Sequence, residues 1–173
     1  MFNVKKMVLA SLFVALGVVL PLAFHAVPNS GRAFLPMHIP VLLCGMICGF
    51  PYGLICGVIA PLLSSLLTGM PPAAMLPSML CELAAYGTAS SLLIRFVRTK
   101  SFYVNIIISL AGAMLSGRIF YGILNALIFS AGSYSMQIWV SAAFVTALPG
   151  IAIQIAVIPT LIALLQRAKL IEV

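Results

Sequence analysis

The sequence predicts an all-α integral membrane protein with six transmembrane helices and with its N- and C-termini cytoplasmic. Of the 173 residues, 64% are hydrophobic and 6% are charged, whereas soluble domains carry about 25% charged residues. The apolar stretches are continuous, which favours helices over the alternating strands of a β-barrel. A bilayer core needs roughly 20 apolar residues per helix, so the chain is long enough for six spans in one membrane domain, residues 1–173.

The placement of the positive charges predicts how these spans are oriented. Most cationic residues precede the first span, lie between the fourth and fifth, or follow the sixth: Lys5, Lys6, Arg95, Arg98, Lys100, Arg167 and Lys169. An excess of Lys and Arg marks cytoplasmic loops, which leaves Arg32 as the cation of an outer loop. The net charge of +7 therefore reflects orientation in the plasma membrane, and nucleic acid is not an expected partner.

Turn-forming residues separate the first three predicted spans. The first span covers residues 7–24, and the outer loop after it, 25–38, is rich in proline, asparagine and glycine, which favour turns. The second span, 39–49, is near the lower limit for a crossing. A tight inner turn at 50–52 leads into the third span, which ends near residue 67.

The last three predicted spans are separated in the same way. The fourth covers 74–94 and follows an outer turn with two consecutive prolines. The fifth covers 102–129 and follows the basic inner loop. The third outer loop, 130–137, precedes the sixth span at 138–165, which Pro149 is able to kink.

Small residues recur every four positions. Across the inner turn they are glycines, at Gly45, Gly49, Gly53 and Gly57. Ser11 and Ala15 repeat this spacing in the first span. Small residues four apart let helix backbones approach closely, so the first span could pack inside the bundle or present a smooth face to another membrane subunit.

Two charged residues, Glu82 and Arg118, lie alone near the middle of long apolar runs. A charge at that depth costs roughly 2.5–3.5 kcal/mol on insertion scales, so such residues usually face a partner, a cavity or a substrate. In helical projection Glu82 shares a face with Ser78 and Tyr86. The function is therefore expected to lie around these two charges.

Polar side chains also follow the outer or middle parts of the last two spans. Arg118 shares a face with Tyr121 and Asn125, and the sixth span carries Gln154, with Trp139 near its outer end. If these stripes face one another, they enclose a small polar cavity with an acceptor, a cation, amides and aromatic walls. Such a cavity suits a compact polar organic ligand better than a bare ion.

The same residues also have structural interpretations. Glu82 and Arg118 could form a salt bridge that only holds two helices together, and tyrosine or amide groups can serve as packing contacts between membrane helices. Trp139 could be an interfacial anchor. His38 lies where the first outer loop meets the second span, and it could either anchor that loop or contact a ligand.

Several motifs of energy-converting and catalytic proteins are absent. The sequence has no GxxxxGK[ST] phosphate loop, no HExxH and no GxSxG motif, so neither ATP hydrolysis nor common hydrolase chemistry is expected. Cys44 and Cys48 have no histidine or carboxylate close by in the sequence, and no metal or cofactor is expected. A substrate-binding membrane subunit that takes energy from a partner fits best. The alternatives are a membrane enzyme using Glu82 or His38 as acid–base, and a structural or channel protein.

Longer stretches of the sequence carry a family resemblance. FLPMHIPVLLCGMICGFPYGLICG (34–57) and PLLSSLLTGMPP (61–72), with the six spans and the Ser11/Ala15 motif, resemble the substrate-binding S component of an energy-coupling factor (ECF) vitamin transporter. The resemblance covers nearly the whole chain. It implies that a vitamin binds at the outer side, through the outer loops and the outer parts of the last three spans.

The same resemblance implies the partners. An S component topples in the membrane to release its vitamin inward, docked on a transmembrane coupling subunit that is driven by two ATPase subunits. Ser11 and Ala15 would form the docking face. The family usually has Ala-x-x-x-Ala there, and serine in place of the first alanine keeps the residue small.

The two charges limit which vitamins are candidate substrates. Arg118 in a pocket of low dielectric would pair strongly with a carboxylate, which favours pantothenate among the small vitamins. Glu82 could instead accept from an aminopyrimidine or a pyridine hydroxymethyl group, as in hydroxymethylpyrimidine or pyridoxine, and riboflavin and cobalamin are further alternatives. The candidate substrate-binding residues are Glu82, Arg118, Tyr86, Tyr121, Asn125, Gln154, Trp139, His38 and Ser78.

Overall fold

The computed structural model of the protein describes residues 3–23, 33–129 and 134–171. All regular elements within these ranges are helices, which confirms the predicted all-α class. In chain order they are α1 (Val4–Ala23), α3 (His38–Cys48), α4 (Tyr52–Thr68), α5 (Leu76–Phe96), α6 (Phe102–Leu124), the π-helix η1 (Asn125–Phe129), α7 (Met136–Val140), the π-helix η2 (Ser141–Val145) and α8 (Leu148–Arg167). Most of the first predicted outer loop, with Arg32, lies outside the described residues.

Three of the described helical stretches are long and apolar enough to cross a membrane. They are α1, the continuous stretch formed by α6 and η1, and α8. Helices α3 and α4 are shorter, with 11 and 17 residues, and α5 has 21 residues but carries several polar side chains. The protein therefore has membrane-spanning helices, and the crossing of all six spans stays a prediction.

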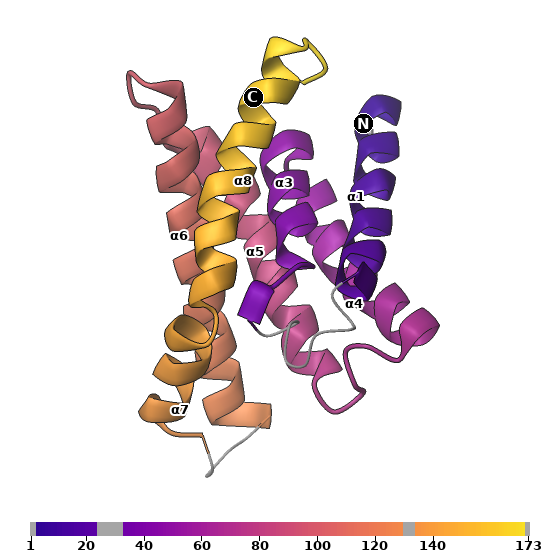
Figure 1. The fold of residues 1–173 in the computed structure, drawn as a ribbon, viewed down its shortest axis with the longest axis vertical. Helices are drawn as coiled ribbons and strands as arrows, with labels where there is room; N and C mark the ends of the chain where they lie inside the picture. Colours follow the sequence, from indigo (N-terminus) through magenta and orange to yellow (C-terminus); the bar gives the residue numbers. More distant parts are fainter. Residues whose placement is uncertain (1–2, 24–32, 130–133, 172–173) are drawn as a thin grey trace.

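Helices α3 and α5 lie in the middle of the bundle, with α1 and α4 to one side and α6 and α8 to the other (Figure 1). Nearly every residue of α3 is buried, as expected for a helix that is apolar all round and surrounded by other helices. By contrast, α1 buries only Ala10, Phe13 and Gly17. Its remaining apolar side chains form an outer surface suited to lipid.

Glycines bring α3, α4 and α5 into backbone contact. A Cβ atom at Gly87 of α5 would overlap the backbone of Gly53 of α4, and one at Gly45 of α3 would lie 2.6 Å from the carbonyl oxygen of Gly87. Only glycine leaves room at these crossings, and the predicted close approach of small residues is confirmed. The approach holds α5, and with it Glu82, against the central helix.

Among the described residues, the loop and terminal cations gather at one end of the molecule, here called the basic end. It comprises the start of α1, the α5–α6 connection and the end of α8, and the two ends of the described chain lie there (Figure 1). Lys6 Nζ donates to the carbonyl oxygen of Cys48 at 3.1 Å, and the Arg95 guanidinium lies against Gly49 in the α3–α4 turn. These contacts tie that turn to the basic end.

The sequence predicts the last span as one helix, and this is wrong in detail. The segment consists of α7, η2 and α8, with a break between Val145 and Leu148. Pro149 accounts for the break, because its ring would collide with the carbonyl of Val145 in a continuing helix and it has no N–H to donate. Proline is tolerated in the first turn of α8, where it lies.

Candidate functional site

The charges of Glu82 and Arg118 meet between α5 and α6. Arg118 Nη1 lies 3.3 Å from Glu82 Oε1, and the two side chains are only 8% and 7% exposed. Each charge therefore has a buried partner, which a lone charge at this depth requires. The contact uses one nitrogen of the guanidinium and one oxygen of the carboxylate.

His38 brings the central helix to the same carboxylate. It is the first residue of α3, at the end of that helix opposite Cys48 and the basic end. Its Nε2 lies 3.7 Å from Glu82 Oε1, and its ring packs edge-on against Tyr86 with centroids 5.0 Å apart. The Tyr86 phenol in turn interacts with both Glu82 and Arg118. Residues from α3, α5 and α6 thus form one buried polar cluster.

Gly117 makes room for the aromatic part of this cluster. A Cβ atom at that position would lie 2.8 Å from Cε1 of Tyr86, so the ring packs directly on the α6 backbone. Arg118 follows Gly117 along α6, so this contact places the Tyr86 ring, which is 1% exposed, beside Arg118.

Several polar atoms of the described residues are buried without a hydrogen-bond partner. At the cluster these are Nδ1 and Nε2 of His38 and Nε and Nη2 of Arg118; Gln154 Nε2 on α8 and the Tyr134 hydroxyl are further examples. Buried polar groups in native proteins are nearly all hydrogen-bonded, and a buried group left without a hydrogen bond costs about 1–3 kcal/mol. Most of these atoms are hydrogen-bond donors, so a ligand that satisfied them would have to supply acceptors.

Tyr134 is the functional candidate that sequence reasoning missed. It lies between η1 and α7, within the third predicted outer loop. Burial raises the pKa of its phenol above the ordinary value, with smaller contributions from the Tyr121 and Glu82 charges that Arg118 opposes. The Tyr134 hydroxyl therefore lies within range of the charges of Glu82 and Arg118. Helical projection could not find it because it applies only to helical residues.

Trp139 fixes α7 to the helix that carries Arg118. Its Nε1 donates to the backbone carbonyl oxygen of Arg118 at 3.0 Å, and its indole lies on Gly122, where a Cβ atom would overlap it. The rings of Trp139 and Phe144 pack edge to face, with their centroids 5.5 Å apart. Trp139 is thus a positioning group for the backbone beside the cluster.

Two predicted site residues are bound to the backbone of their own helix. Ser78 Oγ donates to the carbonyl oxygen of Met75 at 3.0 Å, and Asn125 Nδ2 donates to that of Tyr121 at 2.9 Å. Asn125 begins the π-helix η1, and a second π-helix follows α7. Short π-helical turns are rare and frequently occur at functional sites.

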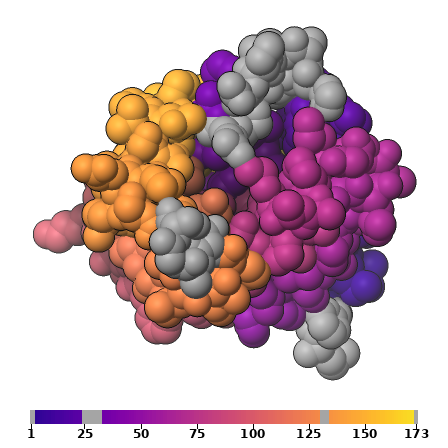
Figure 2. Space-filling model, turned by 90° about the horizontal axis from the view of Figure 1, so that it is seen from below, coloured from indigo at the N-terminus to yellow at the C-terminus, as the bar shows by residue number. Residues whose placement is uncertain are grey.

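The end of the molecule opposite the basic end is hollowed. Figure 2 shows a depression there, bordered on one side by the magenta segments of α4 and α5 and on the other by the orange and yellow segments of α7 and α8. The predicted polar stripes of α5, α6 and α8 are carried by helices around this depression.

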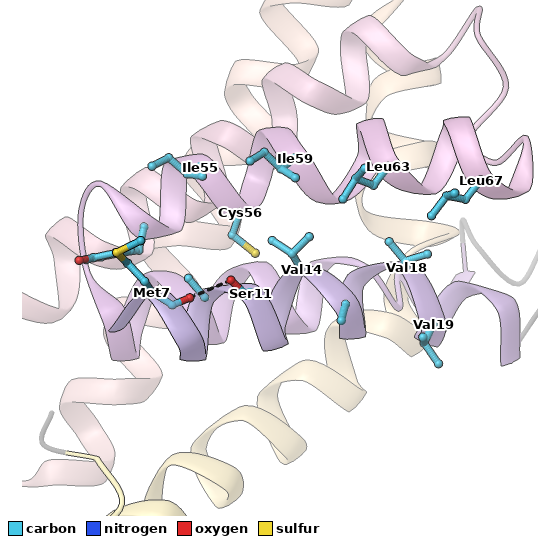
Figure 3. A pocket seen from close by; sticks show the side chains of 13 residues that line it. Met7, Ser11, Val14, Val18, Val19, Ile55, Cys56, Ile59, Leu63 and Leu67 are labelled. Atoms are coloured by element: carbon cyan, nitrogen blue, oxygen red, sulfur yellow. Dashed lines mark hydrogen bonds between the residues drawn. The ribbon is translucent and has the colours of Figure 1, made fainter. Parts of the chain in front are cut away.

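Ser11 and Ala15 lie away from the polar cluster. Both are exposed, and both line an apolar groove of about 670 Å³ between α1 and α4 (Figure 3). The Ser11 hydroxyl donates to the carbonyl oxygen of Met7 at 2.9 Å, so this face of α1 presents no free polar group. Of the two packing alternatives for the first span, the structure leaves the small residues on an outer face.

A helical membrane protein that gathers buried charges and unpartnered donors at one place has the construction of a solute-binding membrane protein. The family model described as ECF transporter, substrate-specific component, matches residues 5–163. The chain belongs to this family, and the resemblance seen in the sequence is confirmed. It is therefore a transmembrane transport protein and the substrate-specific subunit of an ECF importer. No curated protein and no solved structure matches the chain.

Proposed function

We propose that the protein binds a small water-soluble vitamin that carries a carboxylate, with pantothenate as the leading candidate, at the extracellular side of the plasma membrane. It delivers this vitamin inward by docking on a transmembrane coupling subunit driven by two ATPases. One observation carries the choice of ligand. The guanidinium of Arg118 is buried, and only one of its three nitrogens has a hydrogen-bond partner among the described residues.

The free nitrogens of Arg118 define what it can bind. Nη1 contacts Glu82, while Nε and Nη2 have no partner among the described residues. Nε and Nη2 form one edge of the planar guanidinium, and two parallel N–H groups on such an edge bind a carboxylate in a bidentate manner. A carboxylate ligand would supply both missing acceptors and leave the contact with Glu82 in place.

The other polar groups suit the rest of such a ligand. Gln154 Nε2 and the Tyr134 hydroxyl are buried without a hydrogen-bond partner in the part of the chain that the structure describes, and they can bind amide and hydroxyl oxygens. Trp139 and Tyr86 supply apolar walls. Pantothenate combines a carboxylate with an amide and hydroxyl groups, whereas hydroxymethylpyrimidine, pyridoxine or riboflavin would depend on Glu82 as an acceptor. Glu82 already faces Arg118 and His38.

A vitamin panel tests this function. We expect saturating pantothenate to raise the melting temperature of the purified protein without ATP. At 100 times Kd a ligand stabilises by about 2.7 kcal/mol, or roughly 5–11 °C for a chain of this size. Pyridoxine, hydroxymethylpyrimidine and riboflavin serve as matched ligands in the same scan. A shift with one of these instead would reassign the substrate, and no shift with any vitamin would contradict the proposed function.

The clamp alternative is distinguished by the same scan. If Glu82 and Arg118 only hold α5 and α6 together, no vitamin stabilises the protein. A membrane enzyme would instead turn over a substrate as a purified chain without a partner.

The orientation and the docking face belong to this proposal. The seven loop and terminal cations at the basic end support cytoplasmic termini, and six crossings place the hollowed end outside. The exposed face at Ser11 and Ala15 is smooth enough for another helix to approach closely. We infer that the coupling subunit docks there.

Ala15→Leu tests the docking face. We expect vitamin uptake by cells to fall by about tenfold, because losing about 1.4 kcal/mol of contact energy is enough for that factor. Vitamin binding by the purified subunit stays unchanged, because Ala15 is remote from the cluster. Ala111→Leu, at an exposed position of α6, is the control and leaves both unchanged. Loss of vitamin binding in Ala15→Leu would assign α1 to the binding site or to a folding contact.

A further inference from the structure

The groove between α1 and α4 has the dimensions of a lipid chain. Its lining runs from Met7 to Val19 on α1 and from Tyr52 to Leu67 on α4. At 1.5 Å per residue these two sides are about 18 and about 23 Å long, between half and three quarters of the roughly 30 Å hydrocarbon core. The groove thus extends through at least one leaflet, starting at the basic end.

The lining is almost entirely apolar. Val18 of α1 faces Leu63 and Leu67 of α4 across the groove (Figure 3), and Ser11 has its hydroxyl bound to its own helix. A volume of about 670 Å³ with such walls offers water no hydrogen bonds. If it stayed empty, the lining atoms would lose their dispersion contacts. An acyl chain is the apolar filler that a membrane provides.

Positive charge lies at the end of the groove where α1 begins. Lys5 and Lys6 directly precede Met7, and the Lys5 side chain is exposed. Lys6 is held there by its contact with the Cys48 carbonyl. The single acidic side chain of the described residues, Glu82, is paired with Arg118, so no carboxylate within residues 3–23, 33–129 and 134–171 neutralises the two lysines.

We propose that an anionic phospholipid of the inner leaflet binds in this groove, with one acyl chain between α1 and α4 and its phosphate at Lys5 and Lys6. Anionic headgroups are attracted to basic residues beside a membrane helix, and the apolar groove fixes the chain below them. The two features together distinguish a specific lipid site from general contact with the bilayer.

The site has a consequence for docking, which depends on the function proposed above. Ser11 and Ala15 line the same groove, so the bound lipid and a helix of the coupling subunit exclude each other. The lipid covers the apolar face while the subunit is free, and it leaves when the subunit docks.

Native mass spectrometry of the purified subunit tests the lipid site. The probes are phosphatidylglycerol and phosphatidylcholine with identical acyl chains. We expect one phosphatidylglycerol to be retained per protein, with a preference of roughly tenfold over phosphatidylcholine. The double variant Lys5→Gln/Lys6→Gln removes this preference, and Ala15→Phe, which fills the groove, removes retention of both lipids.

Matched variants separate this result from general effects of charge and size. Arg98→Gln/Lys100→Gln removes two cations from the α5–α6 connection, and Ala111→Phe enlarges an exposed position of α6; both keep the preference for phosphatidylglycerol. Equal retention of the two lipids by the unmodified protein, or unchanged retention in the Lys5/Lys6 or Ala15 variants, overturns the proposal. Vitamin binding is measured on the same samples and is independent of these substitutions, so a failed lipid site leaves the vitamin proposal intact.

Discussion

Arg118→Ala is expected to weaken vitamin binding severely, with a loss of affinity of about 30- to 5,000-fold. The substitution removes the two donors proposed for the ligand carboxylate and leaves Glu82 as a buried charge without its partner. Losing a buried charged contact to a ligand costs about 2–5 kcal/mol of binding free energy, whereas truncating one member of a buried charge pair costs about 3–5 kcal/mol of folding stability. Isothermal titration calorimetry measures the affinity, and Arg98→Ala, at an exposed position, is the control.

Two further variants separate binding from folding. Arg118→Lys keeps the charge opposite Glu82 but loses the planar fork, since lysine is a point charge. This variant is expected to fold but to bind pantothenate at least tenfold more weakly. Glu82→Gln removes the negative charge beside the ligand, so affinity for an anion stays the same or rises, whereas a pyridoxine-type ligand binds more weakly. Unchanged affinity in Arg118→Ala would remove Arg118 from the site.

Gly87→Ala is expected to destabilise the protein strongly, although it adds only one methyl group. Its Cβ atom would overlap the backbone of Gly53, and a backbone cannot move aside as a side chain can. Overpacking costs typically 1–3 kcal/mol and occasionally more, and at the upper end this lowers the melting temperature by about 6–12 °C. Thermal unfolding in detergent measures the effect.

Gly112→Ala is the matched control for this prediction. Its Cβ atom would meet the Cδ1 atom of Leu93, 2.9 Å away at the end of a flexible side chain. Alanine also favours a helix over glycine by about 1 kcal/mol, so this variant is expected to be neutral. Equal melting temperatures for the two variants would show that the Gly53–Gly87 crossing does not limit how closely α4 and α5 pack.

The helices themselves were predictable because continuous apolar runs and turn-forming residues are local signals. The predicted second span, 39–49, corresponds to α3, and the fifth, 102–129, corresponds to α6 and η1 together. The sixth span is interrupted at Pro149, where the sequence predicts at most a kink. Whether a proline kinks a helix or interrupts it depends on the surrounding packing, which the sequence alone does not specify.

The candidate site was predictable only in part. The cost of a charge in an apolar run identified Glu82 and Arg118, and helical projection added Tyr86 on the same face. The approach of His38 to Glu82 depends on the glycine crossings between three helices, and glycine spacing alone does not say which helices meet. Ser78 and Asn125 were predicted from the same helical projection, but their side chains bond to nearby backbone carbonyls, as serine and asparagine readily do.

The shortness of α3 bears on the depth of the proposed binding site in the membrane. Eleven residues correspond to a length of about 16 Å, roughly half the thickness of the hydrocarbon core. His38 begins this helix at the end remote from the lysines, so the proposed binding site lies near mid-depth. A solute bound there from the extracellular side has about half of the hydrocarbon core between it and the cytosol. Inward release therefore requires movement of the subunit itself, not only of the solute.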